Sequence, residues 1–162
     1  GKAMTKPEIV NPAVAHTAMF IRRPVSEVFE ALIDPAITSH FWLSKGSDRL
    51  VVGKTVKWEW EMHNMSNEVT ALKIEPNKLI VMELPGYSGP TTVTWTFKEV
   101  EGGTFVEVEE TGWTGTRDEL VSYVCDATGG FTWVLAGMKA WLEHGLELNL
   151  IADRFPKELV GH

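Results

Sequence analysis

The sequence contains one cysteine, Cys125, among 162 residues, and few basic side chains. A single cysteine cannot form a disulfide within the chain, which predicts a reducing, cytoplasmic environment. Lys and Arg number 15 against 22 Asp and Glu, and the resulting formal net charge of −7 at pH 7 argues against a nucleic-acid-binding face. No apolar run approaches the roughly 20 residues of a membrane span. We therefore expect neither a nucleic-acid partner nor membrane insertion.

The sequence patterns of metal and nucleophile chemistry are absent as well. No two of the five histidines stand four residues apart, as the ligands of a helical zinc pair would. Cys125 has no CxxC partner and falls on the apolar stripe of a predicted helix, which favours a small buried side chain over a reactive thiolate. The chain also lacks a GxSxG motif. We therefore expect no metal site, no cofactor and no catalytic nucleophile.

Large apolar side chains are abundant by contrast. The chain has seven Trp, seven Phe and six Met, and side chains of this kind either fill a core or line a pocket. The length fits one domain. We assign residues 1–12 to an irregular N-terminal arm in which Met4 is the expected native start, residues 13–156 to a single domain, and residues 157–162 to a tail.

The first part of the domain predicts a strand and two short helices. Residues 14–21 alternate as a strand does, and Pro24 then favours the first turn of a helix. Apolar residues recur every three or four positions over residues 25–33, which predicts a helix that ends at Asp34-Pro35. A second short helix is expected over residues 36–42.

The middle of the chain changes to a period of two. Apolar residues stand at the even positions from Val56 to Met62 with polar residues between them, which predicts a strand over residues 54–62. A polar turn is expected over residues 63–67. Four further strands are expected over residues 68–74, 79–84, 92–98 and 104–110. Together these segments predict an antiparallel sheet.

The last third predicts one long helix. Apolar residues continue in helical phase from Val121 to Leu146 and pass through Gly129-Gly130 without interruption. Gly130 and Gly137 share a face, which would let another backbone or a bound molecule approach closely; a local kink is the alternative. The long helix is expected to end at Gly145, and a short final helix is expected within residues 146–155.

Several segments resemble a known superfamily. They are residues 129–145, which begin Gly-Gly-Phe-Thr-Trp, residues 21–32, the aromatic pair Phe41-Trp42, and Leu79 after Pro76. They resemble the SRPBCC (START-like, Bet v 1-like) superfamily, in the branch named after activators of Hsp90 ATPase. The resemblance implies an α+β helix-grip fold, in which a curved antiparallel sheet wraps around a long C-terminal helix and two short helices close one end. Because such a sheet meets one helix incompletely, we expect an internal cavity.

Tryptophan, phenylalanine and methionine residues on the inward faces are the candidate ligand-binding residues. Trp and Met suit surfaces that adapt to a bound molecule, whereas packed cores favour Leu, Ile and Val. The alternative is that the same side chains only fill the core. The candidates are Trp42, Trp58, Trp60, Met62, Met82, Trp95, Phe97, Trp113, Phe131, Leu135 and Met138.

Three functions are compatible with these observations. The first is non-catalytic binding of a small hydrophobic molecule, lipid-, polyketide- or aromatic-like, by a carrier or sensor. The second is a protein-interaction module like the Hsp90 co-activators, with a chaperone partner. The third is a cyclase- or hydrolase-like enzyme, which would need a buried acid such as Glu83, or an inward-facing Glu107, Glu109 or Glu110.

A second apolar strip follows the last predicted helix. It consists of Trp133, Ala136, Ala140 and Trp141. This strip either packs under the N-terminal arm or forms a homodimer contact, and the sequence leaves both alternatives open.

Overall fold

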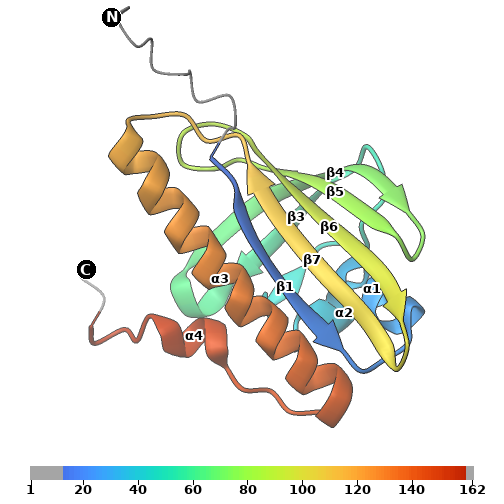
Figure 1. The fold of residues 1–162 in the computed structure, drawn as a ribbon. Helices are drawn as coiled ribbons and strands as arrows, with labels where there is room; N and C mark the ends of the chain where they lie inside the picture. Colours follow the sequence, from blue (N-terminus) through green and yellow to red (C-terminus); the bar gives the residue numbers. More distant parts are fainter. Residues whose placement is uncertain (1–12, 160–162) are drawn as a thin grey trace, which may run out of the picture.

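The computed structural model describes residues 13–159, which form a seven-stranded antiparallel sheet and four α-helices (Figure 1). The predicted arm over residues 1–12, with Met4, and residues 160–162 lie outside the described residues. The strand order across the sheet is β1-β7-β6-β5-β4-β3-β2. The elements are β1 (Ala15–Ile21), α1 (Val25–Ile33), α2 (Pro35–Thr38), β2 (Lys45–Gly46), β3 (Thr55–Trp60), the 3₁₀ helix η1 (Glu61–His63), β4 (Met65–Glu75), β5 (Leu79–Leu84), β6 (Thr91–Val100), β7 (Gly103–Thr111), α3 (Arg117–His144) and α4 (Leu150–Arg154).

The long helix α3 packs along the sheet beside β1 (Figure 1). The hydroxyls of Thr17 and Thr132 lie 2.9 Å apart, and Lys139 Nζ donates to the carbonyl of Phe20 at 2.9 Å. The short helices α1 and α2 pack against each other, and α1 also contacts β6, β7 and α3. This arrangement confirms the α+β helix-grip fold expected from the sequence.

The end of β3 differs from the prediction and shapes the site described below. The alternation of buried Val56, Trp58 and Trp60 holds, but the strand ends at Trp60, and Met62 lies in η1 instead. Asn64 then adopts a left-handed conformation with φ of 49°, which asparagine tolerates well, and β4 begins at the next residue. The predicted turn over residues 63–67 is therefore replaced by a tighter turn that starts earlier.

Helix α3 is continuous through Gly129-Gly130, as its apolar period predicted. It starts earlier than the first periodic apolar residue because Thr116 and Glu119 form a capping box, a signal that the sequence analysis missed. Gly145, with φ of 65°, ends it. A Cβ on Gly137 would lie 3.1 Å from Phe41 Cβ and 3.2 Å from its carbonyl oxygen, so the close backbone approach expected at Gly137 exists.

The centre of the space between the sheet and α3 is filled by side chains. Trp58, Trp95 and Met138 are essentially inaccessible to solvent. The buried residues of α3 begin at Phe131, because the N-terminal half of the helix faces a pocket and solvent. The prediction of a buried Cys125 is therefore wrong: this residue lies in that first half and is exposed.

Candidate ligand-binding pocket

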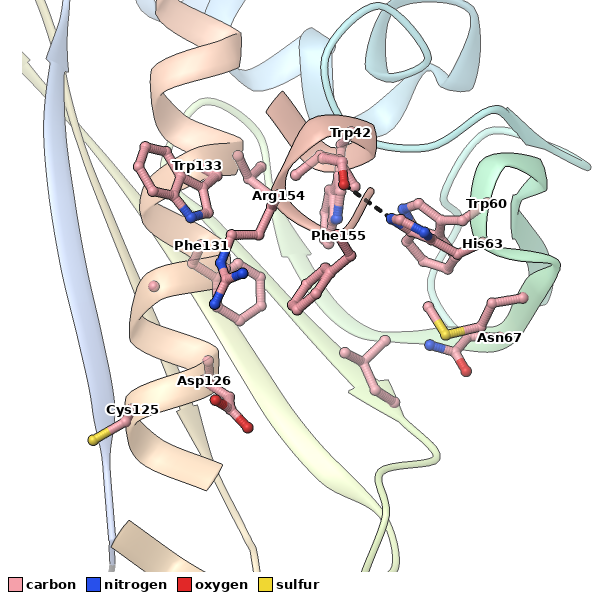
Figure 2. Close-up of a pocket in the computed structure, with 17 residues that line it drawn as sticks. Trp42, Trp60, His63, Asn67, Cys125, Asp126, Phe131, Trp133, Arg154 and Phe155 are labelled. Carbon is pink, nitrogen blue, oxygen red and sulfur yellow. Dashed lines mark hydrogen bonds between the residues drawn. The ribbon is translucent and has the colours of Figure 1, made fainter. Parts of the chain in front are cut away.

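A pocket of about 330 Å³ opens between the middle of α3, helix α4 and the turn that joins β3 to β4. Figure 2 shows Phe131 and Trp133 of α3 on one side of it, with Trp42, Trp60 and His63 on the other. The lining consists of Trp42, Trp60, His63, Met65, Asn67, Leu84, Cys125, Asp126, Ala127, Gly129, Gly130, Phe131, Trp133, Val134, Ile151, Arg154 and Phe155.

Two neighbouring positions in the α3 wall of the pocket are glycines and carry no side chain. A Cβ placed on Gly129 or Gly130 would meet no atom within 4 Å outside the local helix backbone. Gly130 lies four residues from both Asp126 and Val134, so the three share one helix face toward the pocket. Each glycine in a helix interior costs roughly 0.8–1 kcal/mol relative to alanine. The pair therefore opens space beside α3 at a cost to helix stability.

The deep wall of the pocket is an aromatic cluster centred on Trp42. Its ring packs edge to face on Trp58, with centroids 5.0 Å apart and planes at 70°, and on Phe131 at 5.8 Å and 71°. Trp60 and Trp95 lie 6.1 and 5.7 Å from Trp42. Rings packed in this way are held in place by their neighbours, so the wall is rigid before any molecule binds.

Helix α4 forms the outer wall of the pocket and is attached through His63. The Nε2 atom of His63 donates to the carbonyl oxygen of Ile151 at 2.9 Å (dashed in Figure 2). The His63 ring also meets Phe155 edge to face at 6.0 Å, and the Arg154 guanidinium lies 4.4 Å from the centre of the Phe155 ring. These contacts hold a five-residue helix that is too short to be stable alone.

A sequence model of one protein family, described as Activator of Hsp90 ATPase homolog 1-like protein, matches residues 22–143. The chain belongs to this family. The matched segment ends just before the C-terminus of α3. Helix α4, the outer wall of the pocket, therefore lies beyond the part of the chain that the family model covers.

Solved structures with the same fold support the assignment. Protein SSP2350 from Staphylococcus saprophyticus is 30% identical, with a TM-score of 0.72 over 83% of this chain and 95% of that chain. The Aha1 protein from Colwellia psychrerythraea, solved as a dimer, is 21% identical, with a TM-score of 0.71 over 82% and 97%. DynU16, from the dynemicin biosynthetic locus, is 17% identical, with a TM-score of 0.74 over 85% of this chain and 49% of its own, so this chain spans about half its length. No curated protein sequence matches the chain.

The eleven candidate ligand-binding residues lie in three pockets and in the core. Trp42, Trp60 and Phe131 line the main pocket. Met62 borders a small cavity beside the start of α4, and Trp113 lines a neighbouring pocket. The other six are buried in the core and form no part of the pocket lining; they are Trp58, Met82, Trp95, Phe97, Leu135 and Met138.

Other residues of α3 singled out from the sequence lie outside or at the edge of the main pocket. Gly137 is not part of the main pocket lining, because Phe41 already occupies the space beside it. Trp133 lines the pocket, whereas Trp141 stacks on His40 with ring centroids 3.7 Å apart and planes at 8°. Two members of the second apolar strip thus have contacts within the chain, while the arm expected to cover the strip lies outside the described residues.

The buried acid considered from the sequence is Glu110. Glu83 is exposed, whereas Glu110 follows Val106 and Val108 on the inward face of β7 and is only 8% exposed. Burial raises the pKa of the Glu110 carboxyl above its ordinary value, and a hydrogen bond from Thr91 Oγ1 to Oε2, 2.8 Å long, partly opposes this shift. This carboxyl lies in the neighbouring pocket with Trp113 and not in the main pocket.

Over residues 13–159, no three His, Cys, Asp or Glu side chains come together as a metal site requires. Within the same range, no helix has the length and apolar character needed to cross a bilayer.

Proposed function

We propose that this protein binds a small hydrophobic molecule, lipid-, polyketide- or aromatic-like, in the main pocket, as a non-catalytic carrier or sensor. The pocket volume of about 330 Å³ falls within the range of roughly 300–1,000 Å³ that is typical of small-molecule sites. Its walls combine aromatic rings with a few polar groups, such as His63 and Asn67, as ligand sites do.

The observation that carries this proposal is the open space beside Gly129-Gly130, opposite Trp42 and Trp60. Protein interiors are close-packed and leave few spaces of this size between their elements. Here two glycines keep the space open. The space between the aromatic wall and these two glycines suits a bound apolar molecule.

Charged groups stand on the outer side of this space. Asp126 and Arg154 are exposed and line the pocket, and Figure 2 shows both of them beside Phe131. Neither takes part in an ion pair with another described residue. We expect a bound molecule to place its apolar body against Trp42 and any polar end toward these two side chains and water.

Ligand binding is tested with a panel of fatty acids, flavonoids and polyketides. A compound present at 100 times its dissociation constant should raise the free energy of unfolding by about 2.7 kcal/mol, which corresponds to roughly 5–10 °C in Tm for a chain of this size. Native mass spectrometry of the purified protein checks for a molecule carried through purification. No thermal shift across the panel and no retained mass would contradict the proposal.

The two other functions make different predictions. A co-chaperone-like module should stimulate a chaperone ATPase, whereas our proposal expects no stimulation by this chain alone. An enzyme of cyclase or hydrolase type should convert a bound compound, with Glu110 as the buried acid, and Glu110→Gln should then abolish turnover while the compound still binds. Homodimer formation, as in the Aha1 protein from Colwellia psychrerythraea, is measured by sedimentation.

A further inference from the structure

A second pocket of about 250 Å³ lies next to the main one, toward the N-terminal end of α3. The two pockets share part of their lining, including Asn67 and Asp126, but their chemistry differs. The second pocket has two carboxyl groups, Glu110 and Asp126, and three large aromatic rings. None of the described residues that line it is Lys, Arg or His.

The three rings stand in a stack at this pocket. Tyr123 of α3 lies between Tyr87 and Trp113, with centroid distances of 6.3 Å to each and interplanar angles of 16° and 27°. Tyr87 is 88% exposed, so burial in the core does not explain its position. The rings come from three separate segments: the β5–β6 loop, the loop after β7, and α3.

The two loops are held together by hydrogen bonds. Thr114 N donates to Ser88 Oγ at 3.1 Å, and Thr114 Oγ1 donates to the Ser88 carbonyl at 3.2 Å. Each of these two residues directly follows a ring-bearing one: Ser88 follows Tyr87 and Thr114 follows Trp113. These bonds therefore hold together the two loops that carry Tyr87 and Trp113, which lowers the entropic cost of binding.

Glu110 supplies a carboxyl group inside this pocket. It is 8% exposed, and Thr91 donates to its Oε2 atom at 2.8 Å. No described residue donates to the other oxygen, Oε1, and no cationic side chain of the described residues pairs with this carboxyl. A buried carboxylate without a cationic partner is costly, so a positively charged ligand group would be favoured here.

We propose that this second pocket binds the ammonium group of an organic cation. Aromatic faces attract cations through their negative electrostatic potential, and quaternary ammonium groups are typically bound by several rings together. Glu110 and Asp126 add negative charge, and the net charge of −7 attracts cations over longer distances. Burial raises the pKa of Glu110, and a bound ammonium would favour its charged form again.

The proposed cation site shares five lining residues with the main pocket, among them Asp126, but it is tested with a ligand of its own. Gly130 lines the main pocket and not the second one. A small cation that fits the second pocket alone therefore tests the inference without reference to any occupant of the main pocket. Because the two proposals are tested with different ligands, the failure of one is distinguishable from the failure of the other.

The test compares choline with 3,3-dimethyl-1-butanol, its uncharged analogue of the same shape, by titration calorimetry. The wild-type protein should bind choline at least tenfold more tightly than the alcohol. Glu110→Gln and Tyr87→Ala should each weaken choline binding about tenfold. Tyr87 is exposed, so its replacement leaves the core intact and keeps the test valid if Glu110→Gln folds poorly.

The matched control is Glu109→Gln. Glu109 is the exposed neighbour of Glu110 on the other face of β7, so its replacement removes the same charge outside the pocket. This control should bind choline like the wild type. Equal affinity for choline and the alcohol, no saturable choline binding, or an equal loss in Glu109→Gln and Glu110→Gln would each overturn the proposal.

Discussion

Gly130 and Gly137 lie two helical turns apart on α3 and meet different surroundings. Open space adjoins Gly130, whereas Phe41 would lie 3.1 Å from a Cβ on Gly137. Gly130→Ala should therefore stabilise the protein by roughly 0.5–1 kcal/mol through helix propensity. Gly137→Leu should destabilise it by roughly 1–3 kcal/mol through overpacking. Urea unfolding measures both, and equal effects of the two substitutions would contradict the described packing.

Glu110 should make stability depend on pH. Its folded-state pKa is raised by burial, so the native state takes up a proton more readily than the unfolded chain. The stability that protonation contributes is complete below the ordinary carboxyl pKa and is lost as pH rises through the folded value. Since glutamine does not titrate, Glu110→Gln should gain stability relative to the wild type over the pH window that begins at the ordinary carboxyl pKa and ends above the raised folded-state pKa.

Urea unfolding curves at several pH values across this window test the prediction. As pH rises, the difference in unfolding free energy between Glu110→Gln and the wild type should grow in favour of the variant. A difference that stays constant with pH would show that the Glu110 carboxyl is not perturbed by burial.

At the scale of the element, α4 packs against α3 and is joined to the other side of the pocket by His63. Its described link to the sheet side is the hydrogen bond from His63 to the Ile151 carbonyl, with the ring contact to Phe155 beside it. His63→Ala should remove roughly 0.5–1.5 kcal/mol of local stability, which speeds hydrogen exchange in α4 roughly 2- to 13-fold. The Asp153 amide, bonded to the Asn149 carbonyl, is a suitable reporter.

His16→Ala is the matched control for this measurement. His16 is an exposed histidine on β1 whose Nε2 lies 2.8 Å from Glu107 Oε2, away from α4. Exchange in α4 should not change in this variant, and exchange in the sheet should not change in either. Unchanged α4 exchange in His63→Ala would show that other contacts hold the helix.

At the scale of the whole molecule, sequence periodicity predicted most of the fold. The alternation through Trp58 and Trp60 predicted β3, and the helical phase through Gly129-Gly130 predicted a continuous α3. Both patterns work because burial of one face is a local, repeating property of a strand or helix. The early end of β3 depends instead on the left-handed Asn64, which the apolar pattern does not encode.

The candidate site was harder to predict, because periodicity gives the direction of a side chain but not its depth. Trp58 and Trp60 point to the same side of β3, yet only Trp60 reaches the pocket, since Trp42 covers Trp58. Cys125 continues the apolar helical phase, but it lies in the part of α3 that faces a pocket and solvent, so it is exposed. Phe155 lines the pocket because α4 folds back and places the Phe155 ring beside His63, which is far away in the sequence.

The central claim is that an apolar molecule occupies the space beside Gly130. The most direct measurement is the dissociation constant of the tightest compound of the panel for the wild type, Gly130→Ala and Gly130→Leu. A leucine fills the space that the glycine leaves open, whereas an alanine only restores helix propensity. We predict near wild-type affinity for Gly130→Ala and at least a tenfold loss for Gly130→Leu, with both proteins folded. Unchanged affinity in a folded Gly130→Leu variant would contradict the claim.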